Sequence, residues 1–305
     1  MALQSQVGRI IGQEDRALRI RATLLSLLLV AAVLLPVGRA PAQDSDPDFV
    51  FSSGREGGNY HAVALRLRNL LPGRPVGILP SRGSRENLSR LADPGSPVNL
   101  AFTQADALSQ HIAQNPAFAD QFAVLADIGK ECALVIAGRG SGIESAADLK
   151  VAKGRRISVD SEESGGAVTW ESLTRIEPAF LATSAVYVDL MESLAQIKSA
   201  GDFSPIKAAL FVQDPSVESP PVRIVLENPD TFRFVQIGEG DLESPVLPGG
   251  LSVYAFERIR IGGRAFNTIC TRALLIASNP KLAQEKRGEL SKLLLQARFL
   301  PPGAR

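Results

Sequence analysis

The chain has 305 residues, enough for one large domain or for two smaller lobes. Its 33 Lys and Arg residues nearly balance 32 Asp and Glu residues, and the net charge of +1 becomes slightly negative once the leader predicted below is removed. This balance argues against bulk nucleic-acid binding, which requires a basic surface.

The N-terminal stretch has the three parts of a secretory signal peptide. An apolar run over residues 24–37 follows several Arg residues and precedes Ala40-Pro41-Ala42, a small-x-small cleavage signal. We therefore expect a signal peptide over residues 1–42, removed after about Ala42, and a soluble periplasmic protein. The apolar run is shorter than the ~20 residues that a membrane span needs, which makes an uncleaved anchor the weaker alternative.

Strands and helices alternate through the first half of the mature chain. Strands are expected at residues 49–52, 76–79, 98–103, 124–128 and 132–137, and helices at 61–71, from 84 and from 105. This alternation predicts a mainly parallel sheet with helices on both faces. Ligands of such sheets bind beyond the carboxyl ends of the strands. The loops over residues 52–60, 81–84 and 103–106 lie at that edge.

A second α/β unit begins near Gly138. Strands are expected at residues 155–159, 186–190 and 208–212, with helices at 167–176 and 191–200. After Leu247 the pattern changes again, and it predicts a strand at residues 269–277 and a C-terminal helix within residues 281–300.

One strand–loop–helix pattern occurs three times. In each case a short apolar strand leads through a small polar or Gly-rich loop into the start of a helix. The pattern occurs at residues 49–60, 76–84 and 157–166. Helix N-termini carry free N–H groups and a partial positive charge. Several of them at one cleft would form a site for a small anion. The alternative for Gly57 and Gly58 is a turn that needs positive φ.

The order of several motifs resembles one family. The chain is similar to the TAXI family of TRAP-transporter solute receptors in Ser53-Gly54-x-x-Gly57-Gly58-x-Tyr60, Gly83-Ser84-x-Glu86-Asn87-Leu88 and Leu100-Ala101-Phe102-x-Gln104-Ala105-Asp106. It resembles type II periplasmic binding proteins more generally in Gly142-Ile143-x-Ser145-x-x-Asp148-Leu149-Lys150. It departs from the family where residues 151–153 precede Gly154, and where the second-lobe loop reads Glu163-Ser164-Gly165-Gly166.

The resemblance implies a two-lobed α/β fold, the type II periplasmic-binding-protein fold, in which each lobe is a mainly parallel sheet flanked by helices. Lobe I would comprise residues 43–137 and 247–305, and lobe II residues 138–246. The chain would cross the hinge near residues 132–138 and again near residues 237–250. Cys132 and Cys270 would lie near that crossing, either as two buried free thiols or as a disulfide.

We expect the ligand site at the loops where strands join helices. Its candidate residues are Ser53, Gly57, Gly58, Asn59, Tyr60, Ser81, Arg82, Ser84, Gln104, Ser161, Ser164, Gly165 and Gly166. Arg82 would pair with a ligand carboxylate or be a solvated surface charge. Glu162 and Glu163 would complement the dipole of the following helix or favour an amino group on the ligand. Trp170 is expected in the core rather than in a lid.

Catalytic motifs are weak in this sequence. His61 and His111 are the only histidines, and Ser141 stands one position late for a nucleophile elbow. Neither a Walker loop nor a dinucleotide-binding fingerprint occurs. We therefore expect no catalytic residues, no metal site and no cofactor.

Together these features predict an extracytoplasmic solute receptor, not an enzyme. It would bind a small organic anion or amino acid in an interlobe cleft and deliver it to a TRAP-type membrane permease. The implied partners are an anionic or zwitterionic small molecule and the permease subunits, with no nucleic acid. The alternative is a periplasmic ligand sensor or adaptor for a signalling partner; an exported α/β enzyme is less favoured.

Overall fold

The computed structural model describes residues 47–151, 154–237 and 244–299. The chain divides into two units, residues 1–46 and residues 47–305, and every described residue belongs to the second. The predicted signal peptide over residues 1–42 lies outside the described residues. No helix within the described ranges has both the length and the apolar character to cross a membrane.

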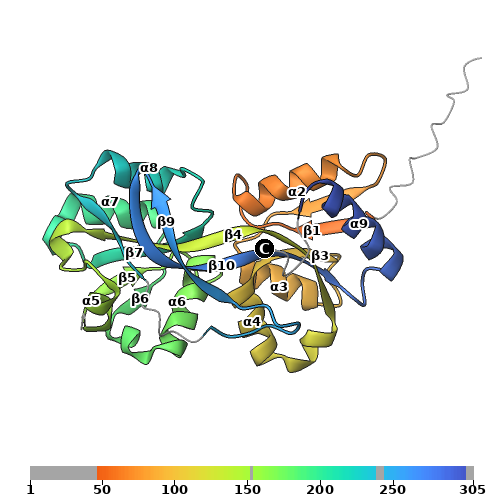
Figure 1. The fold of residues 1–305 in the computed structure, drawn as a ribbon, viewed down its shortest axis with the longest axis horizontal. Coiled ribbons are helices and arrows are strands. Elements are labelled where there is room, and N and C mark those ends of the chain that lie inside the picture. The colour runs from red at the N-terminus through yellow and green to blue at the C-terminus, as the bar shows by residue number, and fades with distance from the viewer. Residues whose placement is uncertain (1–46, 152–153, 238–243, 300–305) are drawn as a thin grey trace, which may run out of the picture. The chain divides into compact units, whose positions relative to one another are not determined.

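In the first lobe, parallel strands alternate with helices (Figure 1). β1 (Phe49–Ser52) pairs in parallel with β2 (Val76–Leu79) and with β3 (Leu100–Gln104). The helices that follow these three strands are α2 (Asn59–Asn69), α3 (Ser84–Ala92) and α4 (Ala105–Gln114), with the short turn η1 (Pro116–Asp120) after α4. Each strand therefore ends in a loop at the same edge of the sheet.

Two long strands connect the lobes: β4 (Phe122–Gly138) and β10 (Arg264–Ser278). They pair with each other antiparallel from Phe122 opposite Ser278 to Cys132 opposite Cys270. Residues 132–138 of β4 form a continuous buried apolar run, as expected for a strand covered on both faces. β10 continues the first lobe's sheet by pairing with β3.

In the second lobe, β4 pairs with β7 (Ile206–Gln213) and β8 (Phe232–Val235). β5 (Arg156–Ser158) lies parallel between β7 and β6 (Ser184–Val186), and β9 (Tyr254–Ile261) forms a hairpin with β10. The longer helices among the described residues here are α5 (Ala146–Val151), α6 (Gly165–Ile176), α7 (Leu190–Ala200) and α8 (Pro220–Glu227). The short helical turns are η2 (Arg139–Ser141), η3 (Pro178–Ala182) and η4 (Gly201–Phe203). The last helix, α9 (Gln284–Gln296), follows β10 back in the first lobe.

This architecture confirms the predicted two-lobed α/β fold. The sheet is mixed, however, because the parallel pairs are confined to the outer strands of each lobe. Among the described residues, every pairing that involves β4 or β10 is antiparallel. The reason is that β4 and β10 cross between the lobes in opposite directions.

The crossing itself differs from the prediction. The two short strands expected at residues 124–128 and 132–137 are one strand, β4, and the long strand β10 also crosses between the lobes. Of the second crossing expected near residues 237–250, residues 238–243 lie outside the described residues. The strand expected at residues 186–190 ends at Val186, and α7 begins at Leu190.

The core packing bears on where the lobes divide. Ile259, Phe266 and Cys270 belong to a buried cluster with Ile136 and Val222, which are residues of the second lobe. The lobe boundaries therefore remain a proposal, and this packing favours placing β9 and the first half of β10 with the second lobe. Trp170 is 3% exposed and packs edge-on against Phe180, in agreement with the expectation that it is a core residue.

A disulfide joins Cys132 to Cys270. The two residues are direct partners in the register of β4 and β10, and they are separated by 138 residues along the chain. Of the two states left open by the sequence, the structure has the bridged one. The bond fastens together the two strands that connect the lobes.

Candidate functional site

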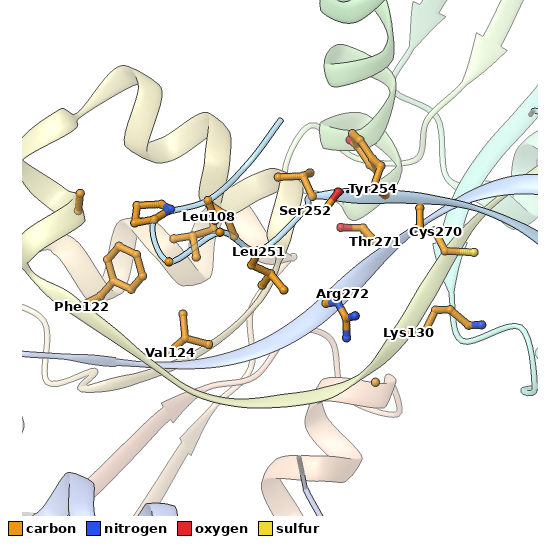
Figure 2. A pocket seen from close by; sticks show the side chains of 18 of the residues that line it. Leu108, Phe122, Val124, Lys130, Leu251, Ser252, Tyr254, Cys270, Thr271 and Arg272 are labelled. Carbon is orange, nitrogen blue, oxygen red and sulfur yellow. Dashed lines mark hydrogen bonds between the residues drawn. The ribbon is translucent and has the colours of Figure 1, made fainter. Parts of the chain in front are cut away.

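Two cavities lie beside the crossing strands. The larger, of about 730 Å³ (Figure 2), is lined by none of the residues proposed for the ligand site. The smaller, of about 320 Å³, lies where the ends of β1, β3 and β7 meet the start of α6. Because the smaller pocket collects the strand-to-helix loops, we describe it first.

The proposed residues divide between lining positions and supporting positions. The loop from β1 to α2 contributes Ser53, Gly57, Gly58, Asn59 and Tyr60 to the lining of the smaller pocket. Ser84, Gln104 and Gly165 line it from the starts of α3, α4 and α6. The three repeated strand-to-helix joins therefore converge on a single pocket.

Four of the other proposed residues have structural roles around this pocket. Ser164 is the N-cap of α6, where its hydroxyl accepts from the Ala167 N–H at 3.1 Å and donates to the Val159 carbonyl at 2.7 Å. Ser81 Oγ accepts from the Gly54 N–H at 3.0 Å. Ser161 Oγ accepts from Arg55 at 3.4 Å. A Cβ on Gly166 would lie 2.7 Å from the Leu210 carbonyl oxygen, so this glycine allows α6 to pack closely.

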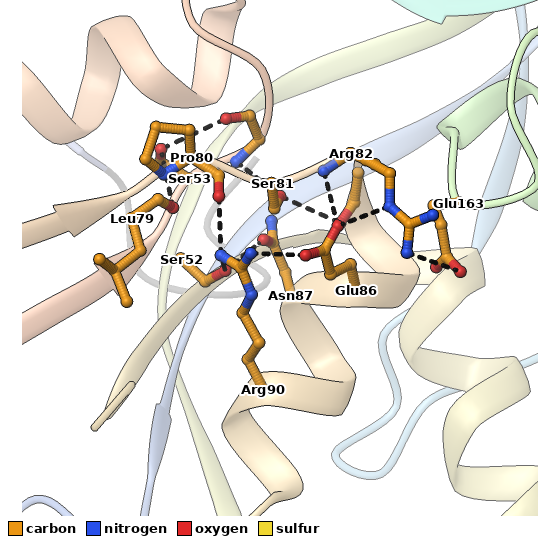
Figure 3. A network of polar contacts seen from close by, with 12 residues as sticks. Ser52, Ser53, Leu79, Pro80, Ser81, Arg82, Glu86, Asn87, Arg90 and Glu163 are labelled. Carbon is orange, nitrogen blue, oxygen red and sulfur yellow. Dashed lines mark hydrogen bonds and ion pairs between the residues drawn. The ribbon is translucent and has the colours of Figure 1, made fainter. Parts of the chain in front are cut away.

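Arg82 lies outside the lining of the pocket. Its side chain is 68% exposed and pairs with Glu86 at 3.1 Å. Arg82 also forms a longer ion pair with Glu163, at 3.7 Å. Both ion pairs are part of a polar network around the start of α3 (Figure 3). In this network Glu86 also pairs with Arg90, which donates to Ser52 Oγ. Of the two possibilities for Arg82, the geometry matches the surface charge.

The start of α2 presents uncapped backbone amides to the pocket. Gly57 has a φ of +78°, and the N-cap residue Gly58 has no side-chain acceptor to offer. The amides of a first helical turn have no partner within the helix. Because Asn59 and Tyr60 line the pocket, their amides are available for an anionic group.

A buried carboxyl group faces these amides. Glu131, on β4, is 6% exposed, and its Oε2 accepts a hydrogen bond from the Tyr60 hydroxyl at 2.9 Å. Burial raises the pKa of Glu131 from 4.5 to about 7, against the opposing effect of hydrogen bonding from Tyr60, Asn59 and Gln104. Tyr60 is held in place by stacking on Phe102.

Gln104 adds a second acceptor. It is 2% exposed, and its Oε1 has no hydrogen-bond partner among the described residues. A Cβ on Gly165 would lie 2.5 Å from this oxygen, so glycine is required there for the side chain of Gln104 to reach the start of α6. A buried acceptor without a donor is costly, and a ligand N–H or O–H would remove that cost.

Two further charged residues line the pocket. Arg55 is half exposed and pairs with Asp160 at 3.1 Å. Asp214, just after β7, accepts hydrogen bonds from the backbone and hydroxyl of Ser216. The pocket thus offers amide and guanidinium donors as well as carboxylate and amide acceptors, which suits a ligand that carries both charges.

Sequence reasoning missed Glu131, Arg55 and Asp214. The one sequence signal for Glu131 is that it and Lys130 are charged residues within an otherwise apolar stretch. Asp214 follows a strand in the second unit, which also placed it at a carboxyl edge.

The two lobes touch beside the pocket. Asp106 at the start of α4 is 1% exposed and accepts from the hydroxyls of Thr169 at 2.6 Å and Tyr254 at 2.8 Å. Gln110 donates to the Val168 carbonyl at 2.8 Å. Arg85 pairs with Glu171 at 2.8 Å. The described conformation is therefore one in which the helices α4 and α6 are in buried contact.

The histidines offer little for catalysis. Ser53 Oγ and His61 Nδ1 are 3.0 Å apart, but Ser53 is fully buried. His111 packs edge-on against Phe118, and burial lowers its pKa. Within the described residues, no group of His, Cys, Asp and Glu side chains is arranged to hold a metal ion.

Comparisons with known proteins gave structural similarities only. No family model and no curated protein matches the chain. Among solved structures, it is similar to XAC2383 from Xanthomonas citri bound to ATP, with a TM-score of 0.49 at 15% identity over 82% of both chains. It is similar to the GluR0 ligand-binding core from Nostoc punctiforme in complex with L-glutamate, with a TM-score of 0.48 at 12% identity over 82% of this chain and 94% of that one. It is also similar to the periplasmic aliphatic sulphonate binding protein SsuA from Escherichia coli, with a TM-score of 0.45 at 14% identity over 83% and 71%. At these scores the similarities carry no argument about the ligand of this chain.

Proposed function

We propose that this chain is an extracytoplasmic solute receptor that binds a small zwitterionic molecule, of the α-amino acid class, in the smaller pocket. The observation that carries the proposal is the convergence of three helix starts and one buried carboxyl group on a cavity of about 320 Å³. That volume is at the lower end of the range of about 300–1,000 Å³ typical of small-molecule sites. Solute capture also needs no covalent chemistry from the lining residues.

The two ends of such a ligand have different partners. A carboxylate would accept from the first-turn amides of α2, aided by the positive charge of Arg55. An ammonium group would donate to Glu131 and to the unpartnered Oε1 of Gln104. A ligand with negative charge alone would leave the Glu131 carboxyl beside it without a cation, which disfavours dicarboxylates relative to zwitterions.

Delivery to a membrane permease of the TRAP type completes the proposal. It is supported by the predicted signal peptide and by the resemblance of the residues 53–60, 83–88 and 100–106 to TAXI receptors. In such a scheme, the lobes in contact around the ligand present a combined surface to the permease.

Calorimetry on the protein without residues 1–42 tests the site directly. The panel contains the neutral and acidic L-amino acids, dicarboxylates and simple amines. We expect at least one amino acid to bind with 1:1 stoichiometry, and to raise the free energy of unfolding by about 2.7 kcal/mol at a ligand concentration of 100 Kd.

A matched pair of variants assigns the ammonium partner. Glu131→Gln should weaken the amino acid by roughly tenfold to a hundredfold, because it replaces a charged hydrogen bond with a neutral one. Glu289→Gln removes a carboxylate from the distant helix α9, where it pairs with Arg74, and should leave the affinity unchanged. A protein that binds no member of the panel, or that binds dicarboxylates better than amino acids, would refute the proposal.

A further inference from the structure

The larger cavity has the character of a second ligand site. It lies beside both crossing strands and is bounded by α4, η1 and the segment that leads into β9 (Figure 2). Its volume of about 730 Å³ is within the range of small-molecule sites. Every lining residue belongs to the described part of the chain.

The walls of this cavity are largely apolar. They include Leu108, Phe122, Val124, Leu247, Leu251 and Val253. Leu108 and Val253 are almost fully buried, so these walls continue the hydrophobic core. An apolar ligand would remove the remaining apolar wall area from water, which favours binding.

The charged side chains of the lining are already paired. Lys130 pairs with Glu257, and Arg272 pairs with Asp127, which is 1% exposed. Each cation has its carboxylate within the protein. A charged ligand would therefore compete with existing ion pairs, whereas a neutral one would leave them intact.

One polar atom is left to meet the ligand. The Thr271 residue is 3% exposed, and its Oγ1 is buried with no hydrogen-bond partner among the described residues. Thr271 lines the cavity, and its hydroxyl points toward Leu251 and Ser252 (Figure 2). A hydroxyl both donates and accepts, so a single hydroxyl or carbonyl group on a ligand would satisfy it.

We propose that this cavity binds a neutral, mostly apolar molecule that carries one hydroxyl or carbonyl group, with Thr271 as its polar contact. Phenols and medium-chain alcohols have this chemistry. The two cavities share no lining residue, so the site is distinct from the smaller pocket. They are neighbours, however, because Thr271 lies directly opposite Glu131 in the register of β4 and β10.

The test uses Nile red as a neutral fluorescent reporter, with 4-ethylphenol and ethylbenzene as competitors that differ by one hydroxyl. We expect saturable 1:1 binding of Nile red, displaced by both competitors. The phenol should be the stronger by roughly threefold to tenfold, the value of one net hydrogen bond. In Thr271→Val, which keeps the shape and removes the hydroxyl, that preference should disappear.

Cavity-filling variants give a second readout. Leu251→Trp should weaken Nile red by roughly tenfold, because the indole overfills the cavity. Leu295→Trp places the same indole on the exposed face of α9 and should bind Nile red as the unmodified chain does. Thermal unfolding shows whether Leu251→Trp is folded. If it is not, Ala119→Trp on η1 fills the cavity from another lining position.

Three results would overturn the proposal: no saturable Nile red signal, equal affinity in the filled variant, or a phenol preference that persists in Thr271→Val. The outcome does not depend on the solute-receptor proposal. Arg55→Ala, which alters the smaller pocket at a half-exposed side chain, should leave Nile red affinity unchanged.

Discussion

The side chain of Glu131 enters the interior from the middle of β4, where its neighbour Cys132 and the strand beyond it are apolar and buried. The Tyr60 hydroxyl donates a hydrogen bond to it at 2.9 Å. Nearby Asp106 is also buried and contributes a repulsion that raises the pKa of Glu131 further. The charged form of this carboxyl is therefore unfavourable in the ligand-free protein.

The free energy of unfolding of the ligand-free protein should decrease as the pH rises from 4.5 to about 7, because Glu131 loses its proton in this range. The pKa of this carboxyl is raised from 4.5 to about 7, so between these values the folded protein binds more protons than the unfolded chain. The free energy of unfolding then decreases with pH, by up to about 3 kcal/mol from this group. Urea unfolding from pH 4.5 to 8 measures the effect, and Glu131→Gln should flatten the curve. Identical pH profiles for both proteins would contradict it.

Gly83 allows the backbones of the two lobes to approach each other closely. A Cβ there would lie 2.2 Å from the Glu163 carbonyl oxygen of the other lobe. Gly83→Ala should therefore keep the lobes apart and weaken ligand binding roughly tenfold. Gly95→Ala is the matched control, since its Cβ would meet only Asp93 Oδ1 at 3.5 Å. Calorimetry compares them, and equal affinities would show that the lobes bind ligand without this contact.

At the scale of elements, the crossing strands are stabilised by pairing along their length and by the Cys132–Cys270 disulfide. The bond closes a loop of 138 residues, so it removes much of the freedom of the unfolded chain. The strands that it fastens also supply residues to both cavities.

Reduction of this disulfide should lower the free energy of unfolding by about 2–5 kcal/mol. Urea unfolding with and without dithiothreitol measures the difference. The double variant Cys132→Ala/Cys270→Ala should have the lower stability in both conditions and no response to the reductant. If dithiothreitol lowers the free energy of unfolding of the double variant by the same amount, the effect does not come from this disulfide.

The elements also show what sequence reasoning reached. The alternation of apolar strands and amphipathic helices predicted both lobes. The repeated loops predicted one hollow near Asn59, Arg82 and Gly165, and the pocket is lined by Asn59 and Gly165 but not by Arg82. Residues 129–131 fall between two strands predicted from the sequence, whereas they belong to one strand, β4. The partners of Lys130 and Glu131, which are Glu257 and Tyr60, are distant in sequence, and local pattern carries no information about such pairings. Ser164 likewise looked like a ligand contact, because a helix cap and an anion site use the same residue types.

At the scale of the whole described unit, the contact between α4 and α6 determines how the lobes meet. Asp106 at its centre is fully buried and depends on Thr169 and Tyr254 for its side-chain hydrogen bonds across the contact. Separation of the lobes would return these groups to water, which makes the contact reversible in principle.

Thr169→Val should shift the protein toward separated lobes, because it leaves the buried Asp106 carboxyl with one donor fewer, at a cost of about 1–3 kcal/mol. The expected result is a larger radius of gyration by X-ray scattering and weaker ligand binding, although Thr169 does not line the smaller pocket. Thr174→Val is the control, since the Thr174 hydroxyl donates to the Glu171 carbonyl within α6 itself. Unchanged scattering in Thr169→Val would refute this role for the contact.

The disulfide between β4 and β10 restricts how the two lobes can move relative to each other. β4 and β10 are hydrogen-bonded along their length and are joined by a disulfide at one point. They cannot shift in register by one residue, because the disulfide would have to break. They can still bend and twist together. We therefore expect any separation of the lobes to be a rotation about these two strands that leaves their backbone pairing at Glu131 unchanged.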